Sequence, residues 1–286
     1  MKKAAIILAI VLLAGCNKAY MESVDKVELT LDLGCAPLTR ADSPLIPDVE
    51  NLIYDVWILQ YDNMGLLIDA GTSHARTTDQ GSLTATVTTT LAIGNGCTIC
   101  VLANLDREDS RASRVWPQTL NEFKTSTSVV DLAEDVKAAN DGTLKDMPMF
   151  GYWEGDIDVK TNNIQVSLGR MLTRINLVIN NQTSSAYHIT SFSNVSHKCY
   201  VFPNIMHNPL PEDAYEDVTI GKQVAAGATA EMYFYMAPNF TSGAENATRL
   251  NIGDKQVILS NGAPDSPDRD YNLYHNSNYT FTINLK

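Results

Sequence analysis

The chain has 286 residues, a length typical of one large all-β unit or of two ordinary domains. It carries 33 acidic and 21 basic residues, a net charge of -12 at pH 7, and no basic cluster. A nucleic-acid partner is not expected, because binding the phosphate backbone requires a concentrated basic face. Apolar residues make up 44% of the chain, which is enough to fill a core and argues against disorder.

The first residues have the pattern of an export signal. Lys2 and Lys3 precede an apolar run over residues 4–13, which is too short for a transmembrane helix. The run ends in Leu13-Ala14-Gly15-Cys16, which resembles the lipobox of bacterial lipoproteins. That resemblance implies removal of residues 1–15 and a lipid on the Cys16 sulfur. We therefore expect an exported lipoprotein; the alternative is an ordinary secretory signal that contains a Cys.

A strand with one apolar face follows a short polar tether. Apolar and polar side chains alternate with the period of a β-strand, and the apolar positions are Val27, Leu29, Leu31 and Leu33. A polar segment bounded by Pro37 and Pro47 comes next, which we expect to be an exposed loop. Arg40 and Ala41 lie in this loop.

The remaining chain predicts an all-β fold with short helices. Strand-like runs separated by turn residues are typical of β-sandwiches, and they occupy residues 52–61, 66–68, 83–89, 98–105, 164–168, 172–179, 188–192, 232–236, 250–252, 257–259 and 279–285. Helical patterns are confined to 119–124 and 129–139. We place one sandwich at 41–160 and a second at 161–286, with the boundary drawn from patterning alone.

Motifs for catalysis or metal binding are weak, and we expect no enzyme, cofactor or metal site. The segment Cys97-Thr98-Ile99-Cys100 matches C-x-x-C, but residues i and i+3 of a strand point to opposite faces, so two metal ligands would diverge. Buried strand cysteines are the better interpretation. Residues 265–270 hold three carboxylates but lack the glycine and final glutamate of a calcium loop, so a solvated acidic loop is expected.

The aromatic residues suggest a second hypothesis for function, the binding of sugars. Trp57, Trp153 and the tyrosines could form a surface on which sugar rings stack, although Trp57 lies in a very apolar strand where core packing is the default.

Taken together, the layout of the chain resembles the fimbrillin family, the type V pilins of Gram-negative surface fimbriae. The local marks are the loop Leu38-Thr39-Arg40-Ala41-Asp42, the strand and turn at 53–65, the segment Met149-Phe150-Gly151 and the final strand at 278–285. The resemblance implies two tandem β-sandwiches of transthyretin-like type. It also implies a lipoprotein precursor that reaches the outer membrane.

In that family an Arg-specific protease cuts the precursor within the loop. Carried onto this chain, the cut bond would be Arg40-Ala41, and residues 16–40 would leave with the lipid and the strand of Val27, Leu29, Leu31 and Leu33. An emptied groove invites a strand from another subunit. The expected donor is the final strand, whose apolar face consists of Tyr279, Phe281, Ile283 and Leu285.

The sequence thus gives two hypotheses for function. The first is a structural subunit of cell-surface fimbriae that supports adhesion, with other fimbrial subunits, the protease and the outer membrane as its partners. The second is a surface lipoprotein that binds glycans through exposed aromatic side chains. Neither hypothesis distinguishes a stalk, tip or anchor subunit.

Overall fold

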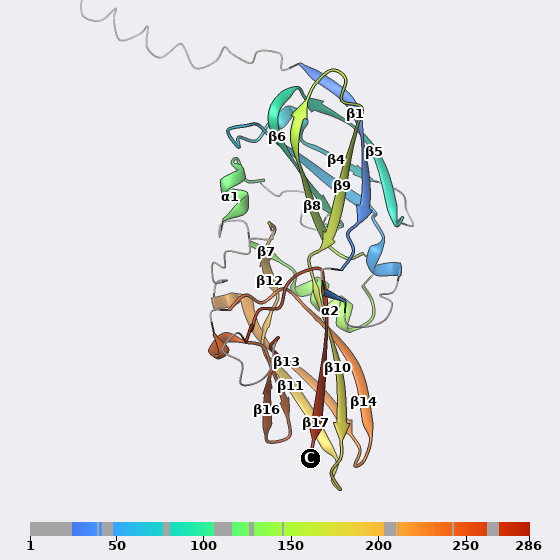
Figure 1. Ribbon diagram of the computed structural model, residues 1–286, viewed down its shortest axis with the longest axis vertical. Helices are drawn as coiled ribbons and strands as arrows, with labels where there is room; N and C mark the ends of the chain where they lie inside the picture. The colour runs from blue at the N-terminus through green and yellow to red at the C-terminus, as the bar shows by residue number, and fades with distance from the viewer. Residues whose placement is uncertain are drawn as a thin grey trace, which may run out of the picture.

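The protein is elongated, with two β-rich domains stacked along its longest axis in the computed structural model (Figure 1). The structure describes residues 25–38, 40–41, 48–76, 81–105, 116–125, 129–144, 146–202, 210, 212–241, 243–261 and 269–286. Strands dominate and helices are few and short, which confirms the all-β fold class. Within these ranges, no helix has the length and apolar character needed to cross a membrane.

A seven-stranded sheet forms the first domain, in the spatial order β4-β3-β6-β8-β9-β1-β5. The strands are β1 (Lys26–Cys35), β3 (Asp55–Tyr61), β4 (Ser73–Arg76), β5 (Thr84–Ala92), β6 (Gly94–Ala103), β8 (Met149–Ile157) and β9 (Asn163–Arg170). Alternating sequences become strands with one buried face, as in β5, where Ala85 and Val87 are buried and Thr86 is exposed. The continuous apolar run of β6 is buried on both faces, as expected for a central strand.

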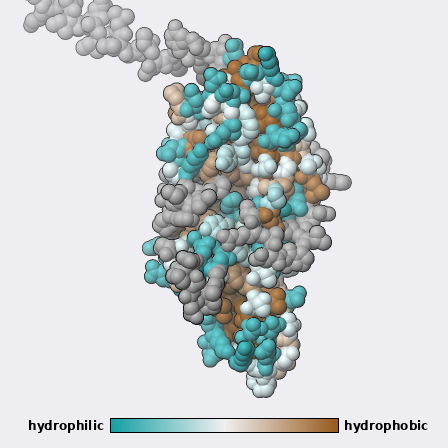
Figure 2. All heavy atoms as spheres, in the orientation of Figure 1, coloured by the Kyte–Doolittle hydropathy of each residue, from teal (hydrophilic) through white to brown (hydrophobic). Residues whose placement is uncertain are grey.

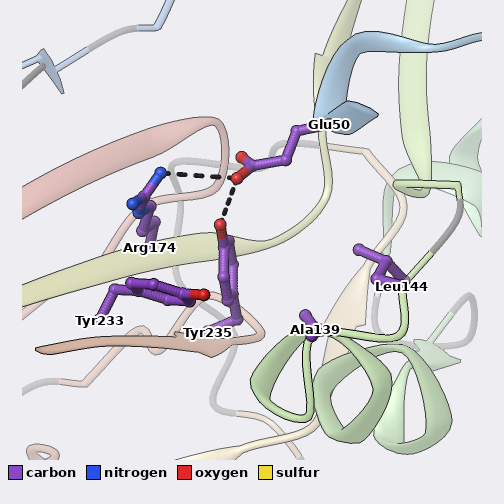
Figure 3. A pocket seen from close by; sticks show the side chains of 7 residues that line it. Glu50, Ala139, Leu144, Arg174, Tyr233 and Tyr235 are labelled. Carbon is purple, nitrogen blue, oxygen red and sulfur yellow. Dashed lines mark hydrogen bonds and ion pairs between the residues drawn. The ribbon is translucent and has the colours of Figure 1, made fainter. Parts of the chain in front are cut away.

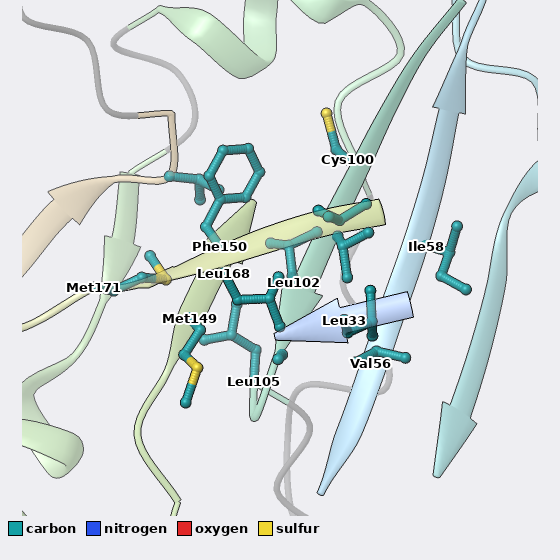
Figure 4. Packing of buried hydrophobic residues seen from close by; sticks show 14 of the residues in the cluster. Leu33, Val56, Ile58, Cys100, Leu102, Leu105, Met149, Phe150, Leu168 and Met171 are labelled. Carbon is teal, nitrogen blue, oxygen red and sulfur yellow. The ribbon is translucent and has the colours of Figure 1, made fainter. Parts of the chain in front are cut away.

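The core of the first domain includes the apolar face of β1. Leu29, Leu31 and Leu33 are 2%, 0% and 3% exposed and belong to the same cluster as the buried residues of β3, β6, β8 and β9. Figure 4 shows Leu33 close to Val56 of β3 within this core. The N-terminal strand is therefore part of the packed interior of the domain.

Two four-stranded sheets form the second domain, in the orders β14-β10-β17-β2 and β13-β11-β15-β16. The strands are β2 (Arg40–Ala41), β10 (Thr173–Asn181), β11 (Tyr187–Ser196), β13 (Tyr215–Val224), β14 (Thr229–Met236), β15 (Arg249–Ile252), β16 (Lys255–Ile258) and β17 (Ser277–Leu285). Phe192 of β11 and Phe234 of β14 stack with ring centroids 4.4 Å apart, so the two sheets face each other across a core of their own.

The chain passes from the first sheet to the second between Arg170 and Thr173. The boundary predicted at residues 160 and 161 falls before β9, and β9 pairs with β1 and β8 in the first sheet, so the change of sheet comes later than expected. Both β9 and β10 alternate with the same period, and periodicity alone does not show which sheet a strand joins.

Short elements complete the structure: the helices α1 (Leu120–Lys124) and α2 (Ala133–Asn140), the 3-10 helices η1 (Asp48–Asn51), η2 (Asp69–Gly71), η3 (Glu212–Ala214) and η4 (Ala244–Asn246), and the paired strands β7 (Val129–Asp131) and β12 (Lys198–Tyr200). The helix α1 begins where predicted, because Thr119 and Glu122 form a capping box. The helix predicted over 129–139 is wrong in its first turn, because residues 129–131 pair with β12 instead.

Hydrophilic side chains cover much of the face shown in Figure 2, and apolar side chains come to the surface in separate patches of both domains. This distribution agrees with the net charge of -12 and with a surface exposed to water.

Candidate functional site

The strand β1, whose removal the family resemblance implies, lies inside the first sheet and not at its edge. It runs parallel to β9, with Leu31 opposite Ile164, and antiparallel to β5, with Leu31 opposite Val87. Among the described strands, β5 has no other neighbour in the sheet. Removal of β1 would therefore create two unpaired edges that face each other across a gap one strand wide.

The gap would be lined by apolar side chains. Its two edges carry the buried residues Ile164, Val166 and Leu168 of β9 and Ala85, Val87 and Leu91 of β5. The three buried leucines of β1 contribute roughly 1.5–3 kcal/mol each when they fill this gap. A replacement strand would need apolar side chains at every second position, and it would need to run parallel to β9.

The bond between Arg40 and Ala41 lies at the junction of the two domains. The backbone of these residues forms β2, which runs parallel to the first residues of β17, with Arg40 opposite Ser277 and Ala41 opposite Asn278. The structure thus brings the expected cleavage bond next to the expected donor strand. The expected lipid site, Cys16, lies outside the described residues.

The strand β17 completes the sheet of its own domain. It pairs in parallel with β10 from Ser277 to Leu285. Tyr279, Ile283 and Leu285 are 2%, 8% and 2% exposed, and Phe281 packs partly buried against the same core. The predicted alternation is confirmed, and the apolar face of β17 is filled by its own domain. Its role as a donor strand stays a prediction.

A buried ion pair fixes η1 against the second domain (Figure 3). Glu50 accepts a hydrogen bond from the Tyr235 hydroxyl, and Arg174 Nη1 lies 3.5 Å from Glu50 Oε1. Burial raises the pKa of the Glu50 carboxyl, which the Tyr235 hydrogen bond and the charge of Arg174 oppose. The Arg174 guanidinium lies 4.9 Å from the centre of the Tyr233 ring, beside a cavity of about 180 Å³.

Two further buried polar residues, Arg170 and Asn276, connect the chain after β1 to the start of β17. Arg170 Nη1 donates to Asn276 Oδ1 at 2.8 Å and to the Ala36 carbonyl at 3.5 Å, and Arg170 Nη2 donates to Asn51 Oδ1. Asn276 Nδ2 donates to the Pro37 carbonyl at 2.9 Å. Arg170 and Asn276 are 6% and 2% exposed, and the search for motifs in the sequence missed both.

His275 lies next to this cluster in the sequence and has a perturbed pKa. Its side chain lines a small cavity with Phe150, Met171 and Tyr200, and burial lowers its pKa. The folded state therefore binds a proton less readily than the unfolded state, in which the pKa is about 6.5. Stability is present above this pH and is lost as the pH falls through the folded-state pKa.

We predict that His275→Gln reduces the loss of folding stability at acidic pH. Urea unfolding of the wild type and the variant at pH 7.5 and 5.5 measures it: the wild type should lose more stability between the two pH values than the variant does. Equal losses would show that His275 does not carry the acid sensitivity.

The four described cysteines, Cys35, Cys97, Cys100 and Cys199, are free thiols. Cys97 and Cys100 are buried in β6, which confirms the interpretation of the C-x-x-C segment as strand cysteines. Burial raises the pKa of both thiols, which keeps them protonated and unreactive. No group of three or more His, Cys, Asp or Glu side chains in the described ranges could hold a metal ion. The acidic segment 265–270 lies largely outside these ranges.

The aromatic side chains of the described residues do not gather into one exposed platform. Trp57 stacks on His74 at 4.6 Å, and both Trp57 and Trp153 pack partly buried against the first core. Among the residues that the structure describes, the tyrosines with exposed side chains are Tyr152 in the first domain and Tyr233 in the second, 46% and 51% exposed.

Solved structures share this arrangement of two domains. The tip fimbrial protein Mfa3 of Porphyromonas gingivalis, solved with a C-terminal truncation, aligns over 92% of this chain and 96% of its own, with 18% identity and a TM-score of 0.62. A fimbrial assembly protein of Parabacteroides distasonis aligns over 90% and 91%, with 13% identity and a TM-score of 0.56. No protein-family model and no curated protein matches the sequence. The chain thus has the fold of these fimbrial proteins.

Proposed function

We propose that this chain is a structural subunit of cell-surface fimbriae, a fimbrillin that is exported as a lipoprotein and cut after Arg40. The cut frees the body of the protein from the lipid on Cys16 and from β1, and the body then polymerises by accepting a strand from another subunit. Fold-level similarity to fimbrial proteins supports the role of a fimbrial subunit.

The position of β1 carries this proposal. A strand that fills the interior of a sheet is normally followed by a short connection to a neighbouring strand, whereas β1 leads into a proline-bounded segment that reaches the other domain. A cut at Arg40-Ala41 would separate β1 from the rest of the chain without breaking any other strand of the first sheet. The emptied gap has the backbone edges and the apolar lining that bind an added strand.

The shape of the molecule supports assembly from head to tail. Figure 1 shows β1 in the upper domain and the end of β17 at the opposite end of the longest axis. A strand offered at one end and accepted at the other end makes a heterologous contact. Such contacts repeat into filaments and do not close into dimers.

The glycan hypothesis lacks a comparable observation. Tyr152 and Tyr233, the exposed tyrosines of the described ranges, lie on separate domains, and sugar recognition by stacking needs aromatic rings that a single ligand can reach. The structure therefore favours the fimbrial subunit.

Arg40→Lys tests the proposal with little change in charge or length. The wild-type precursor, incubated with an Arg-specific protease, should yield a product that begins at Ala41 and polymerises. The Lys variant should stay intact at this bond and monomeric, because the protease requires Arg. Amino-terminal sequencing identifies the cut, and electron microscopy detects filaments.

The same protease acting on Arg76→Lys provides the control, because Arg76 lies in β4, outside the proposed loop. This variant should be cut at Ala41 and should polymerise like the wild type. A wild-type precursor that gives no product beginning at Ala41, or a product that never polymerises, would contradict the proposal.

A further inference from the structure

The start of β17 is bound to the segment that processing would remove. The Pro37 carbonyl accepts a hydrogen bond from Asn276 Nδ2 at 2.9 Å, and Ser277 lies opposite Arg40 in the β2–β17 pair. The Ala36 carbonyl accepts from Arg170, whose guanidinium also donates to Asn276 at 2.8 Å. All three backbone partners precede the bond Arg40-Ala41.

Asn276 is suited to control the first residues of β17. Its φ of 48° is in the left-handed region, where Asn is tolerated better than most residues, and its carboxamide is 2% exposed with the rest of its side chain. The carboxamide oxygen faces Arg170 and the nitrogen faces Pro37, so each end of this side chain is held by a different part of the molecule. The next residue, Ser277, is the first of β17.

Loss of residues up to 40 would take hydrogen-bond acceptors away from both buried side chains at once. Asn276 Nδ2 would lose the Pro37 carbonyl, and Arg170 Nη1 would lose the Ala36 carbonyl while it keeps Asn276 Oδ1 at 2.8 Å. The loss of a hydrogen bond from a buried group is costly, so the side chains would rearrange or water would enter. Either change weakens the point at which β17 begins. The far end of β17, held by Asn180 and Asn284, would be unaffected.

We propose that Arg170 and Asn276, with the carbonyls of Ala36 and Pro37, form a latch that holds the start of β17 until β1 departs. The latch makes β17 available for exchange only in a processed subunit. Premature assembly of precursors is thereby suppressed twice: β1 fills the gap between β9 and β5, and the latch holds β17 in its own domain. This inference rests on the proposed removal of the segment that ends at Arg40.

Asn276→Asp tests the latch in the uncut chain. The carboxylate still accepts from Arg170, and Asp tolerates a positive φ, but it cannot donate to the Pro37 carbonyl. Amide hydrogen exchange of residues 277–280 should become at least tenfold faster, whereas the amides of β11 and β15 should keep their wild-type rates. Asn284→Asp is the matched control: it makes the same change of charge at the far end of β17 and still accepts from Asn180.

A second experiment separates cutting from departure of β1. In this experiment the recognition sequence of an unrelated site-specific protease replaces residues 42–47. Amide exchange is measured in three states: the intact chain, the cut chain with β1 still bound, and the cut chain after β1 has been removed in mild denaturant. Exchange at residues 279–281 should accelerate at least tenfold only in the third state. Unchanged exchange in the third state, or in Asn276→Asp, would overturn the latch.

The two proposals can fail separately. If an Arg-specific protease yields no product beginning at Ala41 but Asn276→Asp accelerates exchange at 277–280, the latch stands and the proposed processing is wrong. If the product at Ala41 polymerises but Asn276→Asp exchanges like the wild type, the processing stands and the latch is wrong.

Discussion

Leu31→Ala is expected to destabilise the precursor by about 3–5 kcal/mol and to leave an assembled filament unchanged. Leu31 is fully buried in the middle of β1, between Ile164 of β9 and Val87 of β5, so truncation leaves a cavity in the first core. If processing removes β1, as we propose, the truncated side chain leaves with it and is not part of the filament. Urea unfolding of the precursor and thermal dissociation of filaments measure the two effects.

Glu28→Ala provides the control, because Glu28 lies on β1 with its side chain exposed. It should change the stability of the precursor by no more than about 0.5 kcal/mol. If Leu31→Ala weakens the filament as much as it weakens the precursor, β1 is retained during assembly and removal of the strand is ruled out. If neither form is weakened, β1 contributes little to the first core, contrary to its burial.

The sequence predicts that β1 is a strand with one buried face, but it does not predict where β1 lies in the sheet. The alternation at residues 27–33 predicts a strand with one buried face, and burial confirms it. Its place between β9 and β5 depends on partners more than 50 residues away, which local periodicity does not specify. The same limit explains the error at 129–131, where pairing with β12 replaces the first turn of a helix.

The sequence contains one sign of the latch residues, but its meaning becomes clear only with the structure. Arg170 continues the inward phase of Ile164, Val166 and Leu168, so the pattern places a charged side chain at a buried position. A buried Arg requires acceptors, and these come from Ala36, Asn51 and Asn276, which are distant in the sequence. Asn276 has no pattern around it that predicts its left-handed backbone. Polar sites assembled from several segments escape motif searches for this reason.

The burial of β17 in its own domain sets the energy of strand exchange. Four apolar side chains that enter the gap left by β1 contribute roughly 6–12 kcal/mol before ordering costs. Tyr279, Phe281, Ile283 and Leu285 give up a similar contribution when they leave the core of the second domain. Exchange between two filled sites is therefore close to balanced. On the proposed mechanism, the irreversible loss of β1 would leave one site empty and so favour strand exchange in the direction of assembly.

A peptide of residues 277–286 is therefore expected to block filament growth when it is added in excess to processed subunits. It carries the apolar face of β17 but brings no second subunit, so it fills the gap between β9 and β5 and ends the chain. The same peptide with Ile283→Asp should not block growth, because a charge would enter an apolar site. Thr282→Asp is the matched control: residue 282 lies on the exposed face, and this peptide should block growth like the parent.

The peptides separate the donor role of β17 from its structural role, which a substitution in the whole protein would not. Ile283→Asp in the full chain would damage the core of the second domain whether or not β17 is exchanged. The peptide leaves that domain intact and probes only the gap. Growth at the same rate with and without the parent peptide would mean that β17 stays in its own sheet and that another strand fills the gap. If all three peptides inhibit growth equally, they bind the filament surface nonspecifically. Insertion beside β9 would instead depend on which face of the peptide carries the charge.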